Sequence, residues 1–158
     1  MLTEQKDALF RLNTFCNKNK IEYAVTGTCA LSLLGVPSNS YPRDLDIKIY
    51  HADERILNKL KELDFLCNLT PATYEGSTTY TFTVNGVKVN ALLDDKSSYE
   101  DMDRELIRID LIDNTAKCRH LINVQTMQYA WAAKMKLGRA KDAAYAMEVI
   151  NCLTLPMA

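Results

Sequence analysis

Apolar positions recur along this chain with two periods, one typical of helices and the other of strands. In the opening segment Leu9, Leu12 and Cys16 lie three or four residues apart, as on one face of a helix. Between Asp44 and Tyr50, by contrast, polar and apolar residues alternate, as on a strand with one buried face. The helical pattern covers about residues 4–18, 28–34, 53–63 and, with a break at Gly138, 124–153. The strand pattern covers about residues 21–26, 44–50, 78–84, 87–93 and 106–112.

Two of these strands are predicted to form a β-hairpin, because Asn85-Gly86 separates them and is the strongest short hairpin signal. The order helix, strand, helix, strand, helix, hairpin, helices predicts an α/β (α+β) fold, with a small mixed β-sheet flanked by helices. The chain contains no repeat, low-complexity tract or linker-like segment. We therefore expect one domain over residues 1–158, with a core of about 21–113 and a C-terminal helical part of about 124–153.

The composition is that of an ordinary globular chain, and it argues against two classes of partner. Of 158 residues, 47% are hydrophobic and 25% are charged, and the formal net charge is −1. Proteins that bind long nucleic acids usually carry a clear basic excess, so such a partner is not expected. No apolar run approaches the ~20 residues of a membrane span, and the first residues contain no hydrophobic leader. We therefore expect a cytoplasmic protein without membrane contact.

The five cysteines are scattered and odd in number, with no C-x-x-C pair and no matching histidine spacing. Neither a disulfide framework nor a zinc site is expected from such a pattern. His51 and His120 have no cysteine or aspartate at a spacing that indicates nucleophilic catalysis. His120 is accordingly predicted to be structural or exposed.

The strongest chemical signal is Asp44-Leu45-Asp46, within a predicted strand. Residues two apart on a strand point the same way, so the two carboxylates can bind one cation. Gly27 ends the preceding strand, where it permits close approach of a ligand to the backbone, and the N–H groups that follow favour an anion. Two carboxylates beside a phosphate site would suit Mg²⁺, which completes its shell with phosphate oxygens and water.

These residues, in this order, resemble the signature of the nucleotidyltransferase superfamily, which has the fold of DNA polymerase beta. The matching segments are Gly27-Thr28-Cys29-Ala30-Leu31 with Gly35, and Arg43-Asp44-Leu45-Asp46-Ile47. The similarity is greatest to the small bacterial branch that includes antibiotic nucleotidyltransferases and AbiEii-like toxin-system proteins. Near the C-terminus, Lys134-Met-Lys-Leu-Gly-Arg139-Ala-Lys-Asp142 is similar to the late basic motif of that branch. The resemblance extends over about residues 21–150.

The resemblance implies transfer of a nucleoside monophosphate from an NTP to a small-molecule or protein acceptor, with release of pyrophosphate. It implies that Asp44 and Asp46 are catalytic residues and the ligands of Mg²⁺. The residues that it implies for nucleotide binding are Gly27, Thr28, Arg43, Lys134, Arg139 and Lys141.

One position departs from the family's pattern. The superfamily places a third carboxylate, which helps to bind metal and can accept a proton, on the second hairpin strand, where this chain has Asn90. An amide offers one neutral oxygen and is no base at neutral pH. One explanation is that Asp94 takes over this role, although ~13 Å of strand separates it from Asn90. Others are that Asn90 is native and transfer is feeble, absent or dependent on another base, that it is an engineered substitution, or that the alignment is shifted.

Asn90 also keeps a second function open. The chain could be a non-catalytic interaction module, such as one component of a toxin–antitoxin pair, in which the fold survives and the chemistry has lapsed. A chain of 158 residues has little room for both an NTP site and an acceptor pocket. We therefore also expect that a homo-oligomer interface could supply part of the site.

Overall fold

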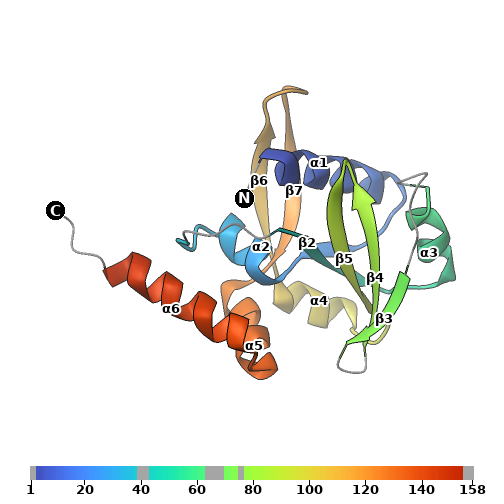
Figure 1. Ribbon diagram of the computed structural model, residues 1–158. Coiled ribbons are helices and arrows are strands. Elements are labelled where there is room, and N and C mark those ends of the chain that lie inside the picture. Colours follow the sequence, from blue (N-terminus) through green and yellow to red (C-terminus); the bar gives the residue numbers. More distant parts are fainter. Residues whose placement is uncertain (1–2, 39–42, 63–69, 75–76, 155–158) are drawn as a thin grey trace.

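The computed structural model describes residues 3–38, 43–62, 70–74 and 77–154, and in these residues seven strands form one mixed β-sheet (Figure 1). The strands are β1 (Tyr23–Val25), β2 (Leu45–Tyr50), β3 (Thr70–Tyr74), β4 (Ser77–Val84), β5 (Val87–Asp94), β6 (Leu106–Asp113) and β7 (Cys118–Gln125). The helices are α1 (Thr3–Lys18), α2 (Gly27–Leu33), α3 (Glu54–Leu60), α4 (Tyr99–Glu105), α5 (Met127–Leu137) and α6 (Ala140–Thr154). The expected α/β class, with a mixed sheet flanked by helices, is confirmed.

The strand order is β3-β4-β5-β2-β1-β7-β6. The two central strands, β1 and β2, run antiparallel, and each has a parallel neighbour on its other side. The parallel neighbour of β1 is β7, which pairs antiparallel with β6. The parallel neighbour of β2 is β5, which pairs antiparallel with β4. The parallel pairing of β2 with β5 brings Asp46 directly opposite Asn90, although the two residues are distant in the sequence.

The two faces of the sheet are covered differently. One face packs on α1 and α3, and its core includes Leu9 and Leu12 of α1 together with Ile47 and Ile49 of β2. Because side chains alternate along a strand, Asp46, Lys48 and Tyr50 point to the opposite face. There α4 covers only the end of β2, where Met102 packs with Tyr50. The acidic residue Asp46 therefore lies on a sheet face that helices cover only in part.

The predicted hairpin is confirmed. Strands β4 and β5 pair through a two-residue turn in which both central residues have positive φ, 51° at Asn85 and 78° at Gly86. That geometry belongs to the turn that Asn-Gly favours. Asp53 caps α3, since its side chain accepts a hydrogen bond from the N–H of Ile56. The predicted end of this helix at residue 63 lies outside the described residues, as does Cys67.

The C-terminal helices α5 and α6 meet at Gly138, whose φ of 60° ends α5 in the left-handed region. A glycine suits this position because other residues are strained there. The two helices pack on α2 through a small apolar cluster that consists of Leu31, Ala130, Tyr145 and Val149. This contact places α5 and α6 beside α2 (Figure 1). In the described part of the chain no helix is both long and apolar enough to cross a bilayer.

Candidate functional site

The acidic pair lies at the start of β2 and is joined to the neighbouring strand by one amide. The Asn90 Nδ2 atom donates to Asp44 Oδ2 and to Asp46 Oδ1, each at 3.2 Å. The Asn90 Oδ1 atom in turn accepts a hydrogen bond from Thr81 Oγ1 at 3.1 Å. Thr81 lies opposite Asn90 on β4. A row of polar side chains therefore crosses β2, β5 and β4.

Burial makes the negative charge of this row unfavourable. It raises the pKa of Asp46, and the charge of Asp44 raises it further. The hydrogen bond from Asn90 and the positive charges of Lys134 and Lys141 act in the opposite direction and lower the pKa of Asp46. Lys88 lies 3.8 Å from Asp44, but both side chains are substantially exposed, so the ion pair is weak. The surroundings of Asp46 thus disfavour its ionised form.

Gly27 brings the turn between β1 and α2 close to the acidic pair. Its φ is +62°, and a Cβ atom on this residue would lie 3.4 Å from Asp46 Oδ2. The adjacent Thr26 N–H donates to the Asp46 carbonyl at 2.9 Å, which fixes the turn beside β2. Cys29 is buried, which raises its pKa to about 12, so its thiol stays protonated and donates to the Asp44 carbonyl at 3.1 Å. The backbone on either side of the turn is therefore held in place.

A buried lysine from α5 reaches the same turn. Lys134 Nζ donates to Thr28 Oγ1 at 2.7 Å and lies 3.5 Å from Asp142 Oδ1. Burial lowers the pKa of Lys134, while the nearby Asp142 carboxylate raises it. Asp142 is only 2% exposed and also accepts two hydrogen bonds from Arg139, at 2.7 and 3.0 Å. Tyr145 lies beneath Lys134, with the ammonium 4.9 Å from its ring centroid.

The structure therefore connects most of the residues predicted from the sequence. Direct contacts join Asp44 and Asp46 to Asn90, and Thr28 to Lys134. Arg139 is linked to Lys134 through Asp142, and Lys141 acts on Asp46 through its charge. Arg43 is exposed at the residue before Asp44.

Thr81, Tyr145 and Lys88 are partners that the sequence did not predict. Thr81 could have been found, because the two-residue turn at Asn85-Gly86 fixes the hairpin register that places Thr81 opposite Asn90. Tyr145 belongs to a helical apolar pattern that looks like ordinary core, and nothing in the sequence distinguishes it.

The structure contradicts the explanation in which Asp94 replaces the third carboxylate. Asp94 lies opposite Tyr50, at the other end of β2 from the acidic pair. Its carboxylate forms an ion pair with Lys48 at 3.2 Å and accepts the N–H groups of Lys96 and Ser97. The strand does not bend to return Asp94 to Asp44 and Asp46, so Asn90 is the residue that faces them.

Comparison with known proteins shows that the chain has a nucleotidyltransferase-like fold. A protein of Thermotoga maritima provisionally classed as a nucleotidyltransferase superposes with a TM-score of 0.64 and 18% identity, over 96% of each chain. An antigenic nucleotidyltransferase-like protein from Paracoccidioides brasiliensis superposes with a TM-score of 0.56 and 17% identity, over 98% of this chain and 76% of the other. No protein-family model and no curated protein matches the sequence.

Proposed function

We propose that this protein binds an NTP together with Mg²⁺ and transfers a nucleoside monophosphate to a small-molecule or protein acceptor. The observation that supports this most is the placement of Asp44, Asp46 and Asn90 beside the Gly27–Thr28 turn, in a nucleotidyltransferase-like fold. We also propose that the chain belongs to the small bacterial branch, because Lys134, Arg139 and Asp142 of its late motif form one network.

The donor atoms at the acidic pair suit a hard divalent cation. The Asn90 amide nitrogen lies 3.2 Å from one oxygen of each carboxylate, so the three side chains meet at a single position. A 180° rotation of the Asn90 amide would present Oδ1 to that position and leave Nδ2 to donate to Thr81 Oγ1. The two orientations differ only in which atom is oxygen and which is nitrogen. Asp44, Asp46 and Asn90 would then offer three oxygen ligands, as Mg²⁺ prefers.

The remaining residues have roles that follow from their positions. Without a side chain, Gly27 would let a phosphate approach the backbone of the turn beside Asp46. Lys134 presents its ammonium at Thr28, where it would bind a phosphate oxygen, and Asp142 holds it there. Arg139, Lys141 and Arg43 would supply further positive charge to the nucleotide. When bound, Mg²⁺ supplies charge neutralisation on the triphosphate and lowers the pKa of the attacking group.

Asn90 gives a second candidate function specific support. Its amide neutralises no charge and accepts no proton at neutral pH, so the site lacks the base that a third carboxylate would provide. In this alternative the protein binds the nucleotide without transferring it, and acts as an interaction module such as a toxin–antitoxin component.

Titration calorimetry with each NTP, in the presence and absence of Mg²⁺, tests the binding that both candidates share. We expect wild-type protein to bind at least one NTP only when Mg²⁺ is present. The double variant Asp44→Ala/Asp46→Ala should lose about 100-fold in affinity, which is about 2.7 kcal/mol. Asp110→Ala is the matched control, because Asp110 is an exposed carboxylate on β6 that pairs with Arg119. Binding of no NTP, or equal binding by the double variant, would contradict the proposal.

Incubation of radiolabelled NTP with cell extract and the protein separates the two candidates. Label that appears on a small molecule or protein, and only when Asp44 and Asp46 are intact, supports transfer. Binding without any labelled product supports the interaction module.

A further inference from the structure

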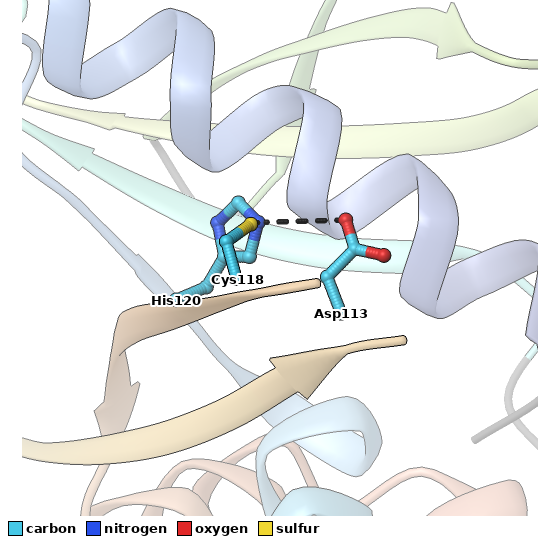
Figure 2. Close-up of side chains that lie close together, drawn as sticks. All are labelled: Asp113, Cys118 and His120. Carbon is cyan, nitrogen blue, oxygen red and sulfur yellow. Dashed lines mark hydrogen bonds and ion pairs between the residues drawn. The ribbon is translucent and has the colours of Figure 1, made fainter. Parts of the chain in front are cut away.

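Three potential metal ligands meet at the end of the β6–β7 hairpin, on the sheet face that packs against α1 (Figure 2). Asp113 and Cys118 are directly opposite each other in the antiparallel pair, and His120 is two residues beyond Cys118. Positions so related project from the same face of a sheet. This cluster therefore lies on the opposite face from Asp46, and the sequence did not predict it because its spacing matches no common zinc motif.

Two of the three donor-atom separations are close to those that a tetrahedral ion requires. Cys118 Sγ lies 3.6 Å from His120 Nε2, and Asp113 Oδ2 lies 3.7 Å from the same nitrogen. One donor atom from each of the three residues lies within 4.8 Å of the other two. With Zn–S of about 2.3 Å and Zn–N and Zn–O of about 2.1 Å, ligand atoms around tetrahedral zinc are about 3.4–3.6 Å apart. The two separations from His120 Nε2 would need to change by only a few tenths of an ångström on binding.

His120 is held in the orientation that a ligand needs. Its ring stacks on Phe10 of α1, with centroids 4.5 Å apart and an interplanar angle of 19°. Its Nδ1 atom is 3.2 Å from Asn13 Nδ2, and Asn13 Oδ1 accepts a hydrogen bond from Tyr23 at 2.8 Å. If the Asn13 amide rotated by 180°, Oδ1 would accept from a protonated Nδ1 and Nδ2 would donate to the Tyr23 hydroxyl. Nε2 would then be free to bind metal, in the usual manner of a histidine ligand supported through its other nitrogen.

Asp113 can bind metal without giving up its structural role. Its Oδ1 atom accepts the N–H groups of Thr115 and Ala116, both at 3.1 Å, which stabilises the hairpin turn. Its Oδ2 atom is the one that faces His120. All three ligands also line a pocket of about 710 Å³ between the hairpin and α1, so an ion would be accessible from one side.

We propose that Asp113, Cys118 and His120 bind a zinc ion, with the fourth position open to water or to a small ligand in this pocket. A thiolate and an imidazole select zinc over Mg²⁺, which prefers oxygen ligands. Three protein ligands with one open position are the arrangement of zinc sites that bind or activate a small molecule. The site is independent of the acidic pair, because no ligand is shared.

Titration of the metal-free protein with Co²⁺ tests this assignment by spectroscopy. Cobalt adopts the same geometry as zinc, and a bound thiolate gives a charge-transfer band that oxygen ligands cannot give. We expect this band, together with intense visible bands of a tetrahedral ion, at one equivalent of Co²⁺, and its loss when Zn²⁺ is added. Absence of the charge-transfer band from wild-type protein would overturn the proposal.

Variants assign the band to its ligands. Cys118→Ser and His120→Gln should each weaken Co²⁺ binding at least tenfold, and Cys118→Ser should abolish the charge-transfer band. Cys152→Ser is the matched control, since Cys152 is a free cysteine on α6 and should leave the spectrum unchanged. Asp44→Ala/Asp46→Ala should also keep the band, which separates this site from the proposed nucleotide site. A band that survives Cys118→Ser would contradict the assignment, and a far-ultraviolet spectrum like that of wild-type protein excludes unfolding as the reason for a loss.

Discussion

Asn90 occupies the position from which a side chain can reach both carboxylates of the acidic pair. Its amide nitrogen donates to Asp44 and Asp46 at 3.2 Å, and these bonds replace part of the solvation that burial removes from Asp46. A carboxylate at the same position would repel both acids unless a cation lay between them. The residue therefore favours a stable metal-free protein over strong metal binding and proton acceptance.

The variant Asn90→Asp tests this balance. Without divalent cations it should unfold more easily, by about 1–3 kcal/mol, because it loses two hydrogen bonds and adds a buried charge. Saturating Mg²⁺ should reverse this loss, and nucleotidyl transfer should rise about 100-fold or more, as expected for a restored general base. Urea unfolding and labelled-NTP assays measure the two effects.

Asn123→Asp is the control for Asn90→Asp, because Asn123 is an asparagine on β7 that donates to the Tyr23 carbonyl. It should lower stability without any rescue by Mg²⁺ and without a gain of transfer. Equal behaviour of the two variants would contradict the role assigned to Asn90.

Asp46→Asn should stabilise the metal-free protein at neutral pH. Burial raises the pKa of Asp46 above its ordinary value of 3.8, so the folded state is penalised once the unfolded state ionises. This penalty is absent below 3.8, develops as pH rises through the raised folded pKa, and is fully present above it. The variant should therefore exceed wild type in urea stability at about pH 7 but match it at about pH 3. A variant that is less stable at neutral pH would contradict the electrostatic account.

At the residue scale, the sequence predicted the acidic pair and its neighbours but not the contacts that offset their charges. Alternation along a strand was sufficient to place Asp44 and Asp46 on one face. The contact of Lys134 with Thr28 depends on how α5 packs against α2, which is a long-range arrangement that residue patterns do not encode. The three ligands on the β6–β7 hairpin were missed for a similar reason, since they meet only through the strand register.

The turn between β1 and α2 is the element that carries the proposed phosphate site. Gly27→Ala should destabilise the protein by about 1 kcal/mol, because a side chain is strained at φ +62°. Its methyl group would also contact Asp46 Oδ2 and fill the space in front of the acidic pair, so Mg-NTP affinity should fall about tenfold, or 1.4 kcal/mol. Calorimetry and urea unfolding separate the two effects.

Gly35→Ala provides the comparison for Gly27→Ala. Gly35 also has a positive φ, +87°, but a Cβ atom there would meet nothing within 4 Å. This variant should lose similar stability and keep full NTP affinity. If both variants bound Mg-NTP as tightly as wild type, the Gly27 turn would not contact the nucleotide.

Asp94 lies on β5, opposite the far end of β2, and belongs to a cluster that joins these two strands to α4. Partial burial raises the pKa of Asp94, but hydrogen bonds from Ser97, from the N–H of Lys96 and from Lys48 outweigh it and lower the pKa to about 2. Lys48 also pairs with Glu105 of α4 at 2.9 Å, so the cluster ties β2 and β5 to that helix. Its contribution is fully present above the unfolded pKa of 3.8 and is lost as pH falls towards 2.

Asp94→Asn should therefore lower the free energy of unfolding by about 1–2 kcal/mol at neutral pH, and by nearly nothing at about pH 2. Unfolding by urea at a series of pH values measures this difference. Asp110→Asn, at an exposed carboxylate that pairs with Arg119, is the control and should differ little in stability from wild type. A loss for Asp94→Asn that is independent of pH would indicate a packing effect instead.

Elements with strong local signals were predicted, and those held by distant contacts were not. The hairpin has its Asn85-Gly86 turn, and α1 has a regular apolar face. Strand β7 was missed because only Ile122 and Val124 of its eight residues are buried, so its apolar pattern is short. Strand β3 was not predicted either. Helix α4 begins at a capping box that Ser98 and Asp101 form.

At the scale of the whole molecule, the sheet separates the two proposed sites. The acidic pair lies on the face that α4 covers in part, and the Asp113, Cys118 and His120 cluster lies on the face that packs against α1. The fold class could be predicted from the order of elements, whereas the full strand order could not. It depends on the parallel pairings of β2 with β5 and of β1 with β7, between residues far apart in the chain.

The most direct test of the proposed function is a crystal structure of the protein with Mg²⁺ and a non-hydrolysable NTP analogue. We predict a cation between Asp44 and Asp46, the Asn90 amide turned so that Oδ1 faces it, and phosphate oxygens at the Gly27–Thr28 turn and Lys134 Nζ. The account is contradicted if the analogue, at saturating concentration, binds elsewhere or not at all while Asn90 Nδ2 still bridges the two carboxylates.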